Sequence, residues 1–245
     1  MSGINKIKFL LPEVCRLFRL DVEWLDIDWN VNYRQDLDGE LKTETASIYA
    51  WIDILEEAIK EGDLVAAMVA IVRVRLYSLS LYGFFINIAE DMERVVLMLP
   101  RQDGDVGAGE VPDVCGCFET LLSDDFKFNK IKTLIPSLSA LSVSGRDFSL
   151  GRWRVDYLSD LDGEFFGERA NLQLHLDLME ESIRVGDGNL VVVALMRFQS
   201  SAQILSDFFK RIFDDIEKAG WPDHEPLADI PEGYELPERY NYPGR

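Results

Sequence analysis

The chain repeats itself at a spacing of 124 residues. The segment NKIKFLLP at 5–12 recurs as NKIKTLIP at 129–136, and the run DLDGE at 36–40 recurs unchanged at 160–164. Across 29–93, about 25 of the 65 positions are identical to the residue 124 positions later, without one gap. Self-similarity over so long a stretch indicates two copies of one structural unit.

The repeat divides the 245 residues into four parts. We predict a first helical repeat at 1–98, a Gly- and Asp-rich linker at 99–125, a second helical repeat at 126–220 and a Pro-rich C-terminal tail at 221–245. Each repeat has the size of an ordinary small domain. The tail holds five of the nine prolines, which are incompatible with a regular helix.

A helical signal runs through both copies. Apolar residues with helical spacing form one stripe in the first copy: Ile48, Ile52, Leu55 and Ile59. The Gly-Asp pairs at 62–63 and 186–187 then predict a helix stop and a capping carboxylate for a second, more apolar helix. That helix is expected over 64–96, with its equivalent over 189–218, and the short turn should make each pair antiparallel. The predicted fold class is mainly α, a tandem duplication of a helical unit built on a long antiparallel helix pair.

The segment ahead of the striped helix has a different period. Apolar residues alternate there with polar ones, at Ile27, Trp29, Val31 and Tyr33, and Trp153, Val155 and Tyr157 keep the pattern in the second copy. A period of two is typical of a half-buried strand. We expect one short strand or extended segment in each unit, with its aromatic residues in the core or packed between the copies; a ligand pocket lined by aromatics would use the same residues.

The DLDGE run predicts the beginning of the striped helix. Its candidate turn and cap residues are Asp36, Asp38, Gly39 and Glu40, with Asp160, Asp162, Gly163 and Glu164 as equivalents. A calcium loop centred on Gly39 would need ligands at Arg34 and Thr45, which do not suit the ion. We therefore expect Asp38-Gly39 to make a turn, a carboxylate to cap the helix, and Glu40 to favour its positive N-terminus.

Two arginines are repeated in the second helix of each copy. Arg73 and Arg197 share a helix face with other repeated residues, so each guanidinium is expected to point inward and to need a partner. Asp53 precedes the Gly62 turn by nine residues and Arg73 follows it by eleven. We predict the ion pairs Asp53–Arg73 and Asp177–Arg197, with a structural role in fixing helix register.

Repeated acidic residues resemble a known metal-binding pattern. The positions are Glu56, Glu57, Glu90, Asp91 and Glu93, echoed by Glu180, Glu181, Asp214, Asp215 and Glu217. They are similar to the EExxE and ExxD patterns of all-α nucleotide pyrophosphatases, which implies magnesium-dependent nucleotide hydrolysis. The spacing departs, because Glu61 comes one residue late and Val185 replaces it in the second copy. Glu56 and Glu57 lie near the turn between the two predicted helices, whereas Glu90 and Glu93 lie roughly 40 Å away, about 27 residues along the second helix at 1.5 Å per residue, so only contact between the copies could unite them.

Catalytic residue types are scarce. Two histidines and three cysteines are too few for the common nucleophile, base or metal-ligand sets, and we predict no cofactor and no metal. The cysteines are odd in number, at Cys15, Cys115 and Cys117, which indicates free thiols in a reducing compartment. The N-terminus does not resemble a signal peptide, and the most apolar stretch, 65–89, carries two arginines. We expect a cytoplasmic protein that does not span a membrane.

The net charge indicates the kind of partner. The chain carries a formal charge of -19, with about -12 in residues 1–124 (11 basic, 23 acidic) and -7 in the remainder (14 basic, 21 acidic). This excess repels nucleic acid and favours a basic protein. Immunity proteins and antitoxins share this charge and size, so the leading hypothesis is a non-enzymatic inhibitor that covers a basic toxin or nucleic-acid-binding enzyme. Its candidate partner-binding residues are Glu56, Glu57, Glu180 and Glu181.

Two alternatives stay open from the sequence. One is a metal-dependent nucleotide hydrolase that uses carboxylates on its helices. The other is a structural or scaffold protein in which the two copies imitate a homodimer with a pseudo-twofold axis.

Overall fold

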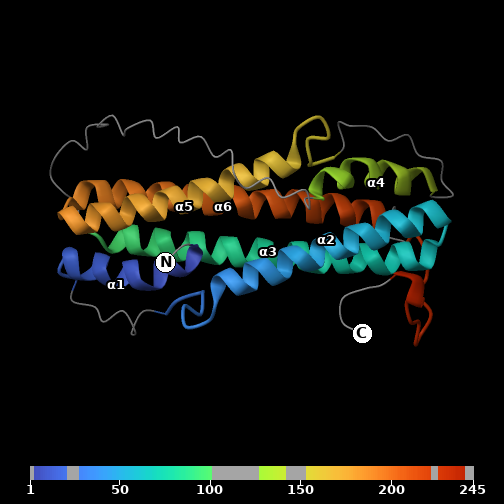
Figure 1. Ribbon diagram of the computed structural model, residues 1–245, viewed down its shortest axis with the longest axis horizontal. Helices are drawn as coiled ribbons and strands as arrows, with labels where there is room; N and C mark the ends of the chain where they lie inside the picture. Colours follow the sequence, from blue (N-terminus) through green and yellow to red (C-terminus); the bar gives the residue numbers. More distant parts are fainter. Residues whose placement is uncertain (1–2, 21–27, 101–126, 142–152, 222–225, 241–245) are drawn as a thin grey trace. The chain divides into compact units, whose positions relative to one another are not determined.

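The structure is a computed structural model that describes residues 3–20, 28–100, 127–141, 153–221 and 226–240 (Figure 1). It is mainly helical, as predicted. The elements in chain order are the 3-10 helix η1 (Ile4–Lys6), α1 (Ile7–Leu17), α2 (Leu37–Glu61), α3 (Leu64–Met98), α4 (Phe128–Leu141), α5 (Leu161–Val185), α6 (Gly188–Gly220) and the 3-10 helix η5 (Glu238–Tyr240). The second helix predicted in each copy is therefore found, as α3 and α6.

The expected strand ahead of α2 does not form. Residues 28–36 are turns and bends, and the structure has no strand in the residues that it describes. The backbone N–H groups of Asn30 and Val31 donate to the carboxylate of Asp91 in α3, at 2.9 and 3.1 Å. Donors that are satisfied by a helix side chain need no neighbouring strand, so the alternating pattern marks an irregular segment in which Val31 and Tyr33 are buried and their neighbours are exposed.

Glycines end α2 and α5 in the same way. Gly62 and Gly186 have φ angles of 70° and 75°, which residues with a Cβ adopt only at a cost. The N–H of Gly62 bonds to the carbonyl of Ile59, and that of Asp63 bonds to the carbonyl of Ala58, which is a Schellman motif. The side chain of Asp63 then accepts the N–H of Ala66 and caps α3. The local sequence determines this turn.

The described chain forms two compact units, and each draws on both predicted copies. One unit consists of Met1–Asp38, Phe85–Asp124 and Gly167–Ile204. The other consists of Gly39–Phe84, Asp125–Phe166 and Leu205–Arg245. Neither unit can be built from residues on one side of the predicted linker.

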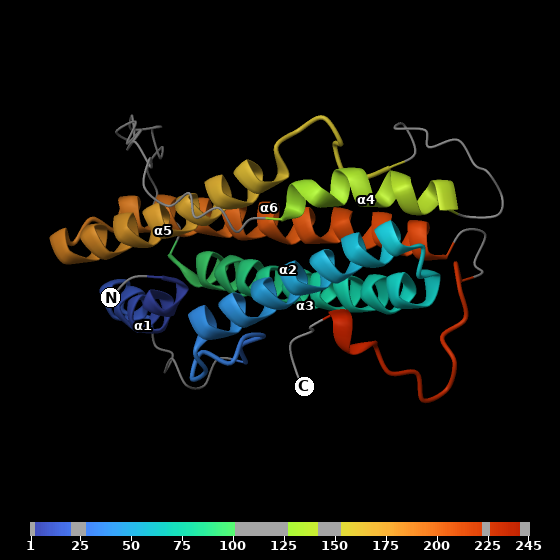
Figure 2. The same cartoon turned by 45° about the vertical axis from the view of Figure 1, so that its right-hand side comes forward.

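The unit that contains α4 is centred on an aromatic cluster. Phe128 at the start of α4 lies 5.1 to 5.8 Å, between ring centroids, from Tyr49, Phe165, Phe208 and Phe209. These residues come from α2, α4, α5 and α6, and Figure 2 shows α4 running alongside α6. Burial of Phe rings at edge-to-face angles stabilises such a core.

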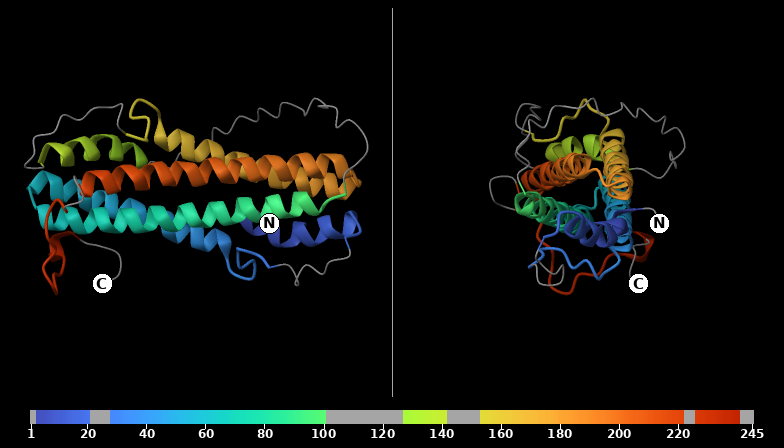
Figure 3. Two further views of the ribbon diagram at one scale, coloured as in Figure 1. Left: turned by 180° about the vertical axis from the view of Figure 1, so that it is seen from behind. Right: turned by 90° about the vertical axis from the view of Figure 1, so that its left-hand side faces the viewer.

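The other unit buries the apolar face of α1. Ile7, Leu11 and Val14 recur at helical spacing and are fully buried. Figure 3 shows α1 beside the C-terminal part of α3, where Ile88, Met92 and Val95 are buried as well. This packing fixes the N-terminus of the chain, where the repeated NKIK motif lies.

Helix α3 is the most apolar element. Among the described residues it is the one helix that is long and apolar enough to cross a membrane by length and composition, and the central helix of a water-soluble bundle passes the same test. Its face toward the other helices is the buried one, with Ala67, Ile71 and Val74 fully covered.

Candidate functional site

The two most strongly repeated motifs, NKIK and DLDGE, contact each other. Asn5 donates its side-chain N–H to Asp36 at 2.6 Å and accepts the N–H of Leu37 at 3.0 Å. The carboxylate of Asp38 accepts the N–H groups of Ile4 and Asn5 at 2.8 and 3.1 Å. We call the group Asn5, Asp36 and Asp38 the first clasp. It satisfies the free N–H donors at the start of the N-terminal helix.

The same geometry recurs 124 residues later. Asn129 donates to Asp160 at 2.7 Å and accepts the N–H of Leu161 at 3.0 Å. Asp162 accepts the N–H groups of Phe128 and Asn129 at 2.8 and 3.2 Å. We call Asn129, Asp160 and Asp162 the second clasp. The repeated sequence motifs thus form equivalent hydrogen bonds in the two copies.

The clasps correct one detail of the sequence interpretation. Asp38 and Gly39 do not form a turn, because both lie in the first turn of α2. Asp38 and Asp162 cap a different helix from the one they belong to, whereas Asp160 sits just before α5 and accepts the N–H of Gly163. Hydrogen bonds from Asn129 and Gly163 lower the pKa of Asp160.

A small residue is required at the second clasp. A Cβ at Gly163 would lie 2.5 Å from an oxygen of Asp160. Of the two glutamates that follow the repeated glycines, Glu40 is exposed and Glu164 pairs with Arg211 of α6. The side chains around the two clasps are therefore not identical in their outer contacts.

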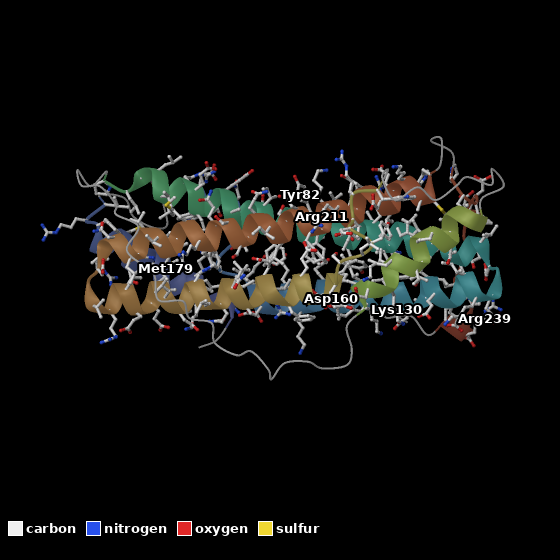
Figure 4. The ribbon with its side chains drawn as sticks, turned by 90° about the horizontal axis from the view of Figure 1, so that it is seen from above. Tyr82, Lys130, Asp160, Met179, Arg211 and Arg239 are labelled. Atoms are coloured by element: carbon white, nitrogen blue, oxygen red, sulfur yellow. The ribbon has the colours of Figure 1, made fainter. Side chains whose placement is uncertain are left out.

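Each clasp is followed by a lysine that reaches the other copy. Lys6 of the first copy pairs with Asp177 and Glu180 of α5, each at 2.6 Å. Lys130 of the second copy pairs with Asp53 and Glu56 of α2, at 2.9 and 2.6 Å (Figure 4). Asp53 and Asp177, and likewise Glu56 and Glu180, are 124 residues apart, so the two contacts are reciprocal.

The ion pairs perturb the ionisation of their members. Burial lowers the pKa of Lys6, but hydrogen bonds to Asp177 and Glu180 outweigh it and raise that pKa overall. The hydrogen bond to Glu56 raises the pKa of Lys130. Lys127 and Lys130 hold the pKa of Asp53 below its usual value despite partial burial.

The predicted pairs Asp53–Arg73 and Asp177–Arg197 are wrong. Asp53 pairs with Lys127 and Lys130, and Asp177 pairs with Lys6. Arg73 is exposed and lies over the ring of Trp51, with 5.7 Å between the guanidinium carbon and the ring centroid. Arg197 is exposed too. A solvated guanidinium needs no buried partner, so the aspartates bind the lysines that face them.

Most of the candidate partner-binding glutamates are already used. Glu56 binds Lys60 and Lys130, Glu180 binds Lys6, and Glu181 binds Arg184. Glu57 is exposed and forms no ion pair within the described residues. Carboxylates that neutralise lysines of the same chain contribute little attraction for a partner.

The sequence interpretation missed the role of Asp91 and Asp215. Both carboxylates are buried, at 0% and 1% exposure, and each accepts two backbone N–H bonds from the turn ahead of α2 or α5. Burial raises the pKa of Asp91 and of Asp215 in spite of these bonds. Nearby charge and burial also raise the pKa of Tyr33 and of Tyr157, which face the carboxylates. The signal available in the sequence was that Asp91 and Asp215 occupy the same position of the two copies, each inside an apolar helix.

The structure does not bring a metal site together in the residues it describes. No group of three or more His, Cys, Asp or Glu side chains is placed there to hold an ion. Asp91 is occupied by backbone donors and Glu56 by two lysines. His175 lies 3.4 Å from the hydroxyl of Ser201, and burial and Arg197 lower its pKa.

The C-terminal segment 226–240 lies against the start of α3. Arg239 and the hydroxyl of Tyr240 donate to the Asp63 carboxylate at 2.9 and 3.0 Å. Leu236 and Tyr240 are buried, at 6% and 2% exposure. The acidic side chains of the segment are exposed, at Asp229, Glu232, Glu235 and Glu238. Docking of the apolar side therefore turns the carboxylates outward.

No family model matches the chain, no curated protein matches it, and no solved structure matches it.

Proposed function

We propose that this chain is a non-enzymatic binding protein, built as a tandem duplication of a helical unit, that covers a basic toxin or nucleic-acid-binding enzyme. Its character is that of an immunity protein or antitoxin. The observation that carries the proposal is that the carboxylates of Asp229, Glu232 and Glu235 are exposed, on a segment whose Leu236 and Tyr240 are buried. Fixed carboxylates attract and orient a basic surface, and they speed its association.

The duplication is supported by contacts in the structure as well as by residue identities in the sequence. The two clasps have matching donors and acceptors, and the lysine pairs are reciprocal between the copies. The antiparallel pairing of α2 with α3 is supported by Trp51 and Arg73, which are each eleven residues from Gly62 and contact each other. We propose that the two copies form a fused pair around a pseudo-twofold axis.

The exposed carboxylates of Asp229, Glu232 and Glu235 suit a binding role better than the glutamates that the sequence indicated. Glu56, Glu180 and Glu181 are neutralised by lysines or an arginine of the same chain. Within 226–240 there are four acidic residues and one basic residue, Arg239, and that arginine is bound to Asp63. The acidic side chains of this segment are exposed to solvent, which supports a partner surface there.

The experiment is binding to basic proteins of the protein's own cell at low and at high ionic strength. We expect a complex at low salt that weakens steeply as salt rises, because charges on surfaces are screened within about 10 Å at 0.1 M. We also expect the bound enzyme to lose its activity. Absence of any complex at low salt contradicts the proposal.

A matched pair of variants locates the surface. Neutralising Asp229, Glu232 and Glu235 as Asp229→Asn, Glu232→Gln and Glu235→Gln should weaken the complex at least tenfold. The control neutralises three carboxylates elsewhere, as Glu40→Gln, Glu93→Gln and Asp214→Asn, and should leave affinity within about twofold. Equal losses in both variants would mean that net charge alone drives binding.

A scaffold role is the second candidate, and the reciprocal lysine contacts favour it. A pseudo-dimer can present two equivalent surfaces to other proteins without inhibiting any of them. The two candidates differ in one measurement, since a scaffold leaves the activity of a bound enzyme unchanged.

A further inference from the structure

The composition of the two compact units shows where the stabilising contacts of this chain lie. In one unit Met1–Asp38 and Phe85–Asp124 pack with Gly167–Ile204, and in the other Gly39–Phe84 packs with Asp125–Phe166 and Leu205–Arg245. Each of the two units therefore combines segments from before the linker with segments from after it. A unit that is built from both sides of a linker depends on contacts between those two sides.

In the unit that contains α1, polar contacts join the segments on the two sides of the linker. Lys6 binds Asp177 and Glu180, with only 13% of the lysine side chain exposed. The N–H of Gly3 donates to the side-chain oxygen of Gln173 at 2.6 Å. These groups fix the N-terminal helix of the first copy on α5 of the second.

In the unit that contains α4, the contacts across the linker are both polar and apolar. The ring of Tyr49 lies 5.1 Å from that of the fully buried Phe128, measured between centroids. Arg75 of α3 is held between Phe213 and Trp221 and pairs with Glu217 at 2.8 Å. Gly220 lies so close to α3 that a Cβ would be 2.8 Å from a methyl of Ile71. Such packing resembles the core of a stable dimer interface.

We infer that the two copies are a non-covalent pair whose natural partner is a second copy of the same module, so that the peptide connection between them is dispensable once the chain has folded. The N-terminal helix of each copy packs on a helix of the other copy. This inference concerns assembly and holds whatever the protein binds.

The test is to cut the folded full-length chain. A sequence for a site-specific protease is inserted between residues 107 and 108, the protein is purified intact, and the insertion is then cleaved. We expect the two fragments to elute together and to give the mass of the uncut chain plus one water in native mass spectrometry. Fragments that separate, or one that precipitates while the other stays in solution, would overturn the inference.

Charge reversal tests the surface in the cleaved protein. Lys6→Glu together with Lys130→Glu should raise the dissociation constant of the fragment pair by about tenfold or more, because each lysine loses two carboxylate partners and gains their repulsion. Arg184→Glu is the control, since Arg184 pairs with Glu181 of its own helix, and it should change the constant less than about threefold. An equal effect of both changes would show that the lysines do not hold the copies together. Circular dichroism of the uncut variants confirms that each is folded.

Discussion

The hydroxyl of Ser206 in α6 donates a hydrogen bond to the backbone carbonyl of Tyr82 in α3, and the two residues are 124 positions apart. They therefore hold equivalent places in the repeat and contact each other. Both residues belong to the unit that contains α4, and Ser206 is fully buried, at 0% exposure.

Replacement of the buried carboxylates should destabilise both copies alike. Asp91→Asn and Asp215→Asn each leave one acceptor oxygen for two backbone N–H donors and bury an added amide N–H. We expect each change to lower the free energy of unfolding by about 2–3 kcal/mol, measured by urea denaturation. Glu93→Gln, two residues further along α3 and exposed, should change it by less than about 0.5 kcal/mol. A loss at only one of the two aspartates would mean that the turns are not equivalent.

The helix-ending glycines give a test of backbone conformation alone. A Cβ at Gly62 or Gly186 would meet nothing within 4 Å, but both residues have positive φ. Each change to Ala should therefore cost about 1 kcal/mol in thermal or urea unfolding. Gly83→Ala is the opposite case, since Gly83 lies inside α3 with free space around it, and it should stabilise the protein by up to about 1 kcal/mol. Destabilisation by all three would contradict the conformations described.

The stabilising effect of Lys130 should depend on pH at both ends of the scale. The pKa values of Asp53 and Glu56 are lowered from 3.8 and 4.5, so their contribution is present above those values and is lost as pH falls through the folded ones. The pKa of Lys130 is raised from 10.5, so its contribution is present below that value and is lost as pH rises through the folded one. The difference in unfolding free energy between wild type and Lys130→Met should be roughly constant from pH 5 to 10. Because the pair is partly exposed, the difference should not exceed about 1 kcal/mol.

The asparagines of the two clasps should contribute equally. Asn5→Ala and Asn129→Ala each remove one donor to an aspartate and one acceptor of a helix N–H. We expect each to lower the free energy of unfolding by about 1–2 kcal/mol. Hydrogen exchange at Leu37 and Leu161 should speed up in the corresponding variant only. Unequal losses would show that the clasps differ in the folded protein.

The local elements of this fold could be predicted from the sequence, and its tertiary partners could not. Helix ends at Gly62 and Gly186 depend on a few adjacent residues, so the pattern was sufficient. The repetition of Arg73 and Asp53 in the second copy favours a contact between the two residues. In the structure, Arg73 contacts Trp51 instead, and Asp53 pairs with Lys130.

The role of Asp91 illustrates the same limit. A carboxylate in an apolar helix must find donors, and the sequence offers many. The donors proved to be backbone N–H groups about 60 residues away, in a segment whose alternation is typical of a strand. Only the arrangement of the helices determines which donors reach the carboxylate.

Charge-swap cycles show whether the N-terminal helix of each copy rests on a helix of the other copy. Lys6→Glu is combined with Glu180→Lys, and Lys130→Glu with Glu56→Lys, and the free energy of unfolding is measured for each single and double variant. We expect the swapped pairs to recover about 0.5–1 kcal/mol relative to the sum of the single changes. The alternative combinations, Lys6→Glu with Glu56→Lys and Lys130→Glu with Glu180→Lys, should recover nothing. Recovery in these within-copy combinations, and none across the copies, would mean that each N-terminal helix rests on its own copy.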